Sequence, residues 1–189
     1  MIGERPSLRT KLPVVKVKPG GSLEVVVVSE EPMTFHAHWL GDRSYMCPGV
    51  DCPACFAGVG ARWHGFVCVR WSLPHGSARP MGLLELTETA YNRLDGLRRM
   101  FDLGNLYGLG AVLERRTKKS PMRAEPLDDV KRAVDGGKPV PFWVLIDAVA
   151  TLYGLPACPG GEFVDGWERA AVPRASQLIR SALPLAVGR

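Results

Sequence analysis

The residues best suited to chemistry lie between Phe35 and Cys55, where three of the five cysteines and two of the four histidines are found. Cys52 and Cys55 have the C-x2-C spacing with which a short loop presents two thiolates to one metal ion. Cys47 precedes Cys52 with four residues between them, and a histidine from the preceding extended segment can complete a tetrahedron. Three thiolates and one imidazole with no open position form a structural zinc site. The sequence therefore predicts that His38, Cys47, Cys52 and Cys55 hold a structural Zn²⁺.

The histidine of this site has other candidates. His36 and His38 are two residues apart and share one face of a strand; His38 is nearer to the loop and is preferred, and His64 is a distant third candidate. The cysteines could instead be a redox pair, which normally requires a strand–helix context rather than a Pro/Gly-rich loop, or fortuitous free thiols. No glutamate lies beside a ligand as a general base, so we expect an ion without a catalytic role.

The composition limits the class of protein. The 189 residues fit one domain with an extension, and 46% hydrophobic residues are typical of a folded core. A net charge of +5 is compatible with an anionic partner. The cysteine cluster favours a reducing compartment, the N-terminus has no apolar signal region, and no apolar run reaches the ~20 residues that cross a membrane. We expect a cytoplasmic protein of a bacterial or phage-infected cell, nucleoid-associated when bound to DNA, with no membrane partner.

Runs of alternating and β-branched residues predict a succession of strands after a flexible leader at residues 1–13. Thr87 is a suitable N-cap for a helix that extends to about Phe101. The expected strands are residues 14–18, 23–29, 34–40, 63–71 and 81–87 before this helix, and 107–116 and 122–127 after it.

Strands, a helix and two further strands follow one another in the order of the OB-fold. The predicted fold class is therefore mainly β, with C-terminal helices: an OB-like five-stranded barrel over residues 14–127 carries the zinc loop as an insertion. A helical extension at 128–154 begins with a short helix at 127–134. Its second helix, 142–153, is apolar nearly all round and is expected to pack on the barrel or on another chain. Residues 155–189 are expected to form a mobile tail with a short helix at 175–183.

Basic residues are concentrated between Arg98 and Arg123, where seven lysines and arginines face two acidic residues. Lysine and arginine neutralise phosphates, and aromatic rings stack on unpaired bases. The predicted surface for single-stranded nucleic acid consists of Arg43, Tyr45, Arg62, Trp63, Phe66, Arg70, Arg115, Arg116, Lys118, Lys119 and Arg123, with the three aromatic rings stacking on bases. The alternative for the strand at 63–71 is that Phe66 and Cys68 belong to the core and Arg70 covers an edge.

The sequence H-W-L at 38–40, followed by C-P-G-V-D-C-P-A-C at 47–55, resembles the zinc-containing single-stranded-DNA-binding proteins of T-even phages. It is more similar still to an H-W…C-P-G-x-D-C-P-x-C loop in uncharacterised proteins of phages and mobile elements. The resemblance covers roughly residues 20–127 and implies a structural zinc that shapes a DNA-binding groove.

The sequence differs from these proteins in two respects. The cysteine spacings are shorter than in the phage protein, and the acidic C-terminal tail of replication-type proteins is missing. Recruitment of replication enzymes through such a tail is therefore not implied.

The leading hypothesis is binding of single-stranded DNA with little sequence preference, in replication, recombination or transposition. Phosphate contacts and stacking occur with both DNA and RNA. The preference for DNA over RNA therefore rests on the resemblance. The alternative is a zinc-stabilised protein–protein interaction module of a mobile-element or phage complex, with helix 142–153 contacting a partner or a second copy. An enzyme is not expected. Zinc deaminases require an H-x-E motif, which is missing after His36 and His38, and no P-loop or nucleophile elbow is present.

Overall fold

The computed structural model describes residues 11–71, 80–117, 120, 123–131, 137–158 and 164–187. The chain divides into two compact units. The sheet unit comprises Leu12–Thr34 and Trp63–Leu145, and the cysteine unit comprises Phe35–Arg62 and Ile146–Arg189 together with Met1–Lys11.

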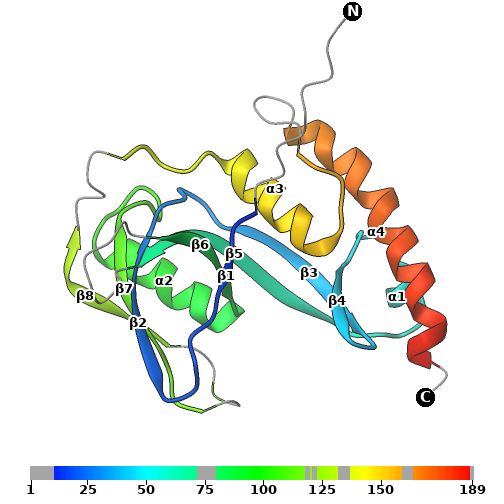
Figure 1. The fold of residues 1–189 in the computed structure, drawn as a ribbon, viewed down its shortest axis with the longest axis horizontal. Helices are drawn as coiled ribbons and strands as arrows, with labels where there is room; N and C mark the ends of the chain where they lie inside the picture. The colour runs from blue at the N-terminus through cyan, green and yellow to red at the C-terminus, as the bar shows by residue number, and fades with distance from the viewer. Residues whose placement is uncertain are drawn as a thin grey trace, which may run out of the picture. The chain divides into compact units, whose positions relative to one another are not determined.

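The sheet unit contains six paired strands (Figure 1). Their order across the sheet is β1-β6-β5-β2-β7-β8; β1 pairs with β6 in parallel, and the other neighbours are antiparallel. The bounds are Val14–Val15 for β1, Gly21–Val27 for β2, Ala61–Trp71 for β5, Met81–Leu86 for β6, Leu109–Arg115 for β7 and Arg123–Lys131 for β8. The first two residues of β5 belong to the cysteine unit.

Helix α2, Glu88–Met100, lies against β6 and β8 and contributes Ala90, Leu94 and Leu97 to the core. These residues recur at helical spacing, so they share the face that packs on the sheet. The predicted N-cap is confirmed: the Thr87 side chain accepts a hydrogen bond from the Ala90 amide at 3.2 Å. Buried valines of β2 and β5 form the opposite side of this core.

The cysteine unit contains a β-hairpin and helices (Figure 1). Strand β3, Met33–Leu40, pairs with β4, Arg43–Met46, and the first two residues of β3 belong to the sheet unit. Helix α1, Pro53–Phe56, follows in the loop. Helix α3, Phe142–Tyr153, enters this unit at Ile146, and helix α4, Val164–Val187, packs against α1 and β4. Ile179 and Ala182 of α4 form a small core with Leu40, Tyr45 and Ala54.

The predicted order of elements holds in part. Strand β2 lies between β5 and β7, and α2 connects β6 to β7. However, in the described part of the chain β1 pairs only with β6 and β8 only with β7, so the sheet is open at both ends and a barrel is not shown. With helices α1 to α4 present, the fold is mixed α/β rather than mainly β.

Three predicted segments differ from the structure. The cysteine loop contains β4 and α1, neither of which was predicted. The helix predicted at 127–134 is wrong, because β8 continues as a strand to Lys131; residues 132–134 lie outside the described part, as do residues 1–10 of the predicted leader. The tail predicted to be mobile forms α4 instead. Pro173 suggests a break because proline normally disrupts a helix interior, but buried α4 residues such as Ala171, Ala175 and Ile179 stabilise the helix through their packing.

Helix α3 has the predicted bounds, and its centre from Leu145 to Ala150 is buried within the chain. Among the described residues, no helix has the length and apolar character needed to cross a membrane.

Replacing Thr87 by alanine is expected to lower the free energy of unfolding by about 1 kcal/mol, because the amide at the start of α2 loses its side-chain acceptor. Chemical denaturation measures the change. Thr89→Ala, at an exposed position in the first turn of the same helix, is the control and should change stability little. Equal effects of the two substitutions would contradict the capping role.

Candidate metal centre

Four ligand atoms from separate parts of the cysteine unit meet in one place. The ring nitrogen or sulfur atoms of His38, Cys47, Cys52 and Cys55 all lie within 4.8 Å of one another. Two thiolates bound to the same tetrahedral zinc at ~2.3 Å lie about 3.8 Å apart, and the Sγ atoms of Cys47 and Cys55 are 3.8 Å apart. The Nε2 atom of His38 is 3.2 Å from the sulfur of Cys52 and 3.5 Å from that of Cys55. The spacing of these donors therefore fits a single metal ion.

The orientation of His38 is fixed by its second ring nitrogen. Nδ1 lies 3.3 Å from the carbonyl oxygen of Gly60 and can donate its hydrogen there, which leaves Nε2 directed at the sulfur atoms. Metal-binding histidines are commonly oriented in this way by a backbone carbonyl. His36 is exposed and is not a member of the cluster, and His64 forms an ion pair with Glu85 in the sheet unit at 2.8 Å. The preference for His38 agrees with this arrangement.

The local fold explains how the cysteines converge. The register of β3 and β4 places His38 opposite Tyr45, and the amide of Cys47 donates to the carbonyl of His36. Gly49 has a φ of 96°, a conformation that residues with a Cβ rarely adopt, and its carbonyl accepts from the amide of Cys52 at 3.2 Å. This turn brings Cys52 back beside the hairpin, and helix α1 then carries Cys55 to the same point.

The burial of polar ligand groups favours a bound ion, because buried polar groups without partners are costly. His38 and Cys52 are fully buried, Cys47 is partly buried and Cys55 is exposed. Burial raises the pKa of the Cys47 thiol to about 12, so a metal ion must displace protons from the sulfur atoms as it binds. Metal affinity should accordingly rise with pH. The arrangement is a closed Cys3His set, which is suited to a structural ion and leaves no position for a substrate.

The residues predicted to contact nucleic acid are divided between the two units. Arg43 and Arg62 are exposed in the cysteine unit, where the Nε of Arg43 donates to the Tyr45 hydroxyl at 2.9 Å. Tyr45 itself is buried, and Phe66 is only 1% exposed in the sheet core. Because neither ring is accessible to a base, the prediction that Tyr45 and Phe66 stack on bases is wrong. The alternative that places Phe66 and Cys68 in the core is confirmed.

The other predicted residues lie in the sheet unit. Trp63 is half-buried against Tyr91, with ring centroids 5.6 Å apart. Arg70 is also half-buried, and its Nε has no hydrogen-bond partner among the described residues. Arg115, Arg116 and Arg123 lie at the end of the sheet where β7 and β8 are joined. Lys118 and Lys119 lie outside the described residues.

Sequence reasoning missed several exposed side chains near the metal ligands. Trp39 is 60% exposed, Phe56 is 78% exposed and Val50 is 95% exposed. Trp39 follows the buried His38, so strand alternation turns its side chain to the other face. This alternation could have predicted that Trp39 is exposed, but only if it had been known that His38 is the buried histidine.

Comparison of the chain with models of protein families, with curated proteins and with solved structures finds no match.

The substitution Cys52→Ser is expected to abolish stoichiometric metal binding and to unfold the cysteine unit, because it removes a buried ligand that also packs beside Ala54 and Ile179. Metal content after gel filtration and circular dichroism of the helices measure the two effects. His36→Asn is the control, since His36 is exposed outside the cluster. Full metal content in Cys52→Ser, or loss of metal in His36→Asn, would contradict the assignment.

Thiol reactivity gives a separate test. A chelator should make Cys47, Cys52 and Cys55 react with a thiol reagent, because they lose their shared ion. Cys68 should stay slow with or without chelator, since burial raises the pKa of its thiol to about 12. Mass spectrometry of the labelled peptides identifies each site. Identical labelling of the first three cysteines before and after chelation would show that they hold no ion.

Proposed function

We propose that this protein binds single-stranded DNA with little sequence preference, in replication, recombination or transposition, and that His38, Cys47, Cys52 and Cys55 hold a structural Zn²⁺. The pairing of β2 with both β5 and β7, and the position of α2 between β6 and β7, are typical of an OB-fold. The cysteine loop lies between β3 and β5 in the chain, which corresponds to a loop that borders the binding face in OB-folds. We propose a binding role rather than a catalytic one.

The observation that carries the proposal is a basic end of the sheet. The register pairs Gly21 with Arg115, and Glu114 with Arg123. The turn before β2 brings Lys18 to the same end, where its carbonyl accepts from the Gly21 amide at 3.0 Å. We call Lys18, Arg115, Arg116 and Arg123 the basic end. Lys18 was not predicted, because its nearness depends on the pairing of β2 with β7.

The chemistry of the basic end favours a flexible polyanion. Lys18 and Arg116 are exposed, and Arg115 and Arg123 are partly exposed, so they can approach phosphates without rearrangement of the core. Glu114 is the acidic residue paired opposite Arg123, and it offsets only part of this charge. Each phosphate neutralised releases condensed counterions, which gives binding that weakens as salt rises.

Stacking is assigned to different rings from those predicted. Tyr45 and Phe66 are buried, and Trp39 and Phe56 of the cysteine unit are the most exposed aromatic rings among the described residues. Each stacked base contributes roughly 1–3 kcal/mol in single-strand binding proteins. The resemblance of the cysteine loop to phage single-stranded-DNA-binding proteins supports the same ligand.

A second function is favoured by exposed apolar residues. Val50 and Phe56 expose apolar surface beside the metal ligands, and Phe142 and Leu152 expose apolar surface on α3. Exposed apolar residues are common in protein-binding surfaces. A zinc-stabilised module that binds a protein partner is therefore the alternative to nucleic-acid binding.

The test is fluorescence anisotropy of a labelled single strand of ~20 nucleotides, compared with the matching duplex and with RNA of the same sequence, at two salt concentrations. The double substitution Arg116→Ala and Arg123→Ala is expected to weaken single-strand binding and to lower the salt slope by about 0.7 for each phosphate that the protein no longer neutralises. Trp39→Ala should weaken binding without changing the slope, because stacking releases no counterions.

Arg174→Ala is the matched control, since Arg174 is exposed on α4 and contacts Gln177. An unchanged salt slope in the double variant would remove the basic end from the proposal. No binding of any strand at low salt would reject nucleic-acid binding and leave the protein-interaction module.

A further inference from the structure

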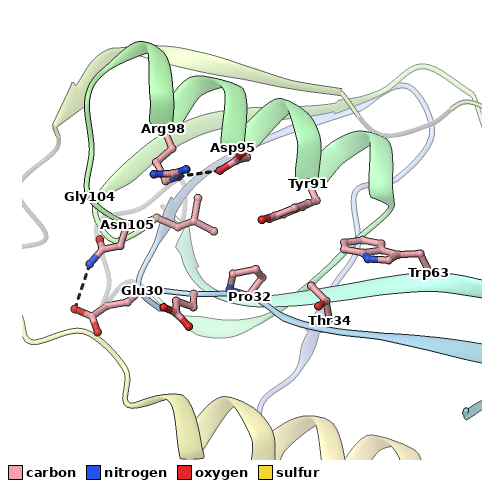
Figure 2. A pocket seen from close by; sticks show the side chains of 11 residues that line it. Glu30, Pro32, Thr34, Trp63, Tyr91, Asp95, Arg98, Gly104 and Asn105 are labelled. Carbon is pink, nitrogen blue, oxygen red and sulfur yellow. Dashed lines mark hydrogen bonds and ion pairs between the residues drawn. The ribbon is translucent and has the colours of Figure 1, made fainter. Parts of the chain in front are cut away.

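A cavity of about 510 Å³ lies within the sheet unit, and none of its lining residues is a ligand of the metal centre (Figure 2). Its wall includes Glu30 and Glu31 from the segment between β2 and β3, Thr34 from β3, Trp63 from β5, and Tyr91 and Asp95 from α2. Neither the basic end nor the metal site uses the cavity. Its volume is suitable for one or two side chains of a ligand and is too small for a helix.

The side chain of Glu30 is held in place at the edge of this cavity. The amide nitrogen of Asn105 donates to the Glu30 carboxylate at 3.2 Å (Figure 2). The amide oxygen of Asn105 accepts from the backbone of Tyr107 at 3.1 Å, and the Leu106 amide donates to the Glu30 carbonyl at 2.9 Å. Since both ends of the Asn105 side chain are engaged, the carboxylate has a defined position before any ligand binds.

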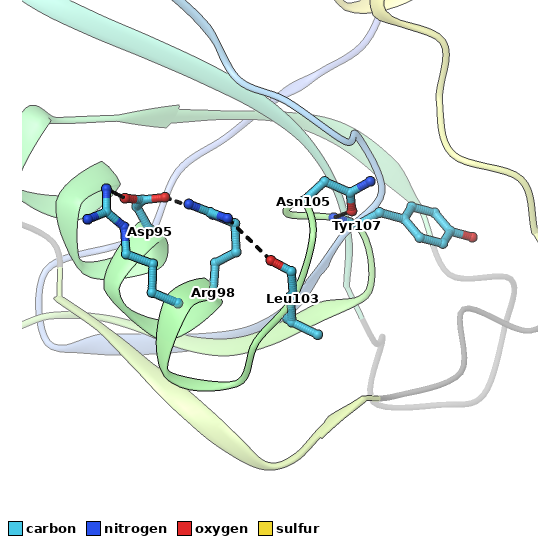
Figure 3. A network of polar contacts seen from close by, with 6 residues as sticks. Asp95, Arg98, Leu103, Asn105 and Tyr107 are labelled. Carbon is cyan, nitrogen blue, oxygen red and sulfur yellow. Dashed lines mark hydrogen bonds and ion pairs between the residues drawn. The ribbon is translucent and has the colours of Figure 1, made fainter.

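A second network fixes the opposite wall (Figure 3). Asp95 accepts from Arg98 at 2.8 Å and from Arg99 at 2.6 Å, and Arg98 also donates to the Leu103 carbonyl at 3.2 Å. The hydrogen bond from Arg98 holds the pKa of Asp95 below its usual value, so this carboxylate stays charged. The guanidinium of Arg98 is therefore occupied by Asp95 within α2 and by the carbonyl of Leu103 after the helix.

Two aromatic rings complete the wall. The rings of Trp63 and Tyr91 are 5.6 Å apart with an interplanar angle of 30°. Gly65 lies under the indole: a Cβ at this position would be 2.4 Å from the far edge of the Trp63 ring. The absence of a side chain at Gly65 therefore allows Trp63 to lie flat along β5 and face Tyr91.

The charge of the cavity is opposite to that of the protein. Glu30, Glu31 and Asp95 contribute three carboxylates to the lining, whereas Arg98 is the single cationic residue among the described lining residues and is paired with Asp95. Within the described part of the chain, Glu30 and Glu31 have no ion-pair partner. Two uncompensated carboxylates beside aromatic rings repel phosphate and attract a cation.

We propose that this cavity is a binding site for an arginine side chain presented by a basic segment of a partner protein. A guanidinium is planar, so it can stack on an aromatic face while its N–H groups donate in-plane to carboxylates. Lysine provides a point charge without a stacking plane and fits less well. This site goes beyond the proposed nucleic-acid binding and does not require it.

The cavity and the basic end can act independently. Leu106 at the cavity precedes β7, and Arg115 ends β7. Six strand intervals at ~3.3 Å place the two ends roughly 20 Å apart. This separation exceeds the Debye length of ~8 Å at physiological salt, so the acidic cavity does not cancel the basic end.

The experiment measures anisotropy of a labelled glycine-rich peptide containing two arginines, with the full-length metal-loaded protein and no nucleic acid. The arginine peptide is expected to bind at least about fivefold more tightly than the same peptide with lysines. The double substitution Glu30→Gln and Glu31→Gln, at exposed positions that leave the core intact, should weaken arginine-peptide binding about tenfold or more. Trp63→Leu should reduce the preference for arginine over lysine.

The matched control removes the same charge elsewhere: Glu114→Gln with Glu168→Gln, both exposed and outside the cavity. Unchanged binding in this control supports the site. Absence of peptide binding, equal binding of the arginine and lysine peptides, or equal loss in the control would overturn it. Competition by free arginine amide at the same concentration as the peptide would overturn the assignment to a protein segment. None of these outcomes alters the salt-slope test of nucleic-acid binding.

Discussion

The convergence of four possible metal ligands, His38, Cys47, Cys52 and Cys55, is the constraint on which the cysteine unit depends. Two of the four ligands, His38 and Cys52, are completely buried, and buried polar groups without partners are costly. The apolar core around them is small, consisting mainly of Leu40, Tyr45, Ala54 and residues of α4. A metal ion bound beside such a small cluster would itself contribute folding free energy. Because Cys52 belongs to the same cluster as Ile179, the packing of α4 depends on the conformation of the metal loop.

The sheet unit is stabilised differently. Its core is extensive and apolar, with valines of β2 and β5 facing α2, and it contains no ligand of the metal cluster. We therefore assign the binding roles proposed for this unit to its charged surface groups and to the rings beside them. The strand register separates that charge along β7: arginines gather where β7 and β8 are joined, and carboxylates line the cavity near the start of β7. The two proposed ligands, which carry opposite charges, can then bind at different places on one sheet.

Hydrogen bonds and ion pairs hold the polar groups that line the acidic cavity in place. Asn105 connects Glu30 to the backbone of Tyr107, while Asp95 connects two arginines at the end of α2. The ion pairs of Asp95 join residues three or four apart on one helix, and such pairs contribute little to stability. Their effect is to hold charged groups in fixed positions, which reduces the ordering cost of binding.

The sequence by itself determined the cluster of candidate metal ligands, the N-cap of α2 and helix α3, because each depends on neighbouring residues. A C-x2-C spacing, a threonine before a helical run and a continuous apolar segment express local geometry that tertiary contacts did not alter. Tertiary structure decided the rest. Phe66 and Tyr45 are buried rather than exposed, since strand alternation indicates two faces but not whether one or both are covered. Helix α4 extends through Pro173 because packing compensates for a missing hydrogen bond. Lys18 joins Arg115, and Glu30 meets Asn105, only through contacts between residues far apart in the chain, which no local pattern encodes.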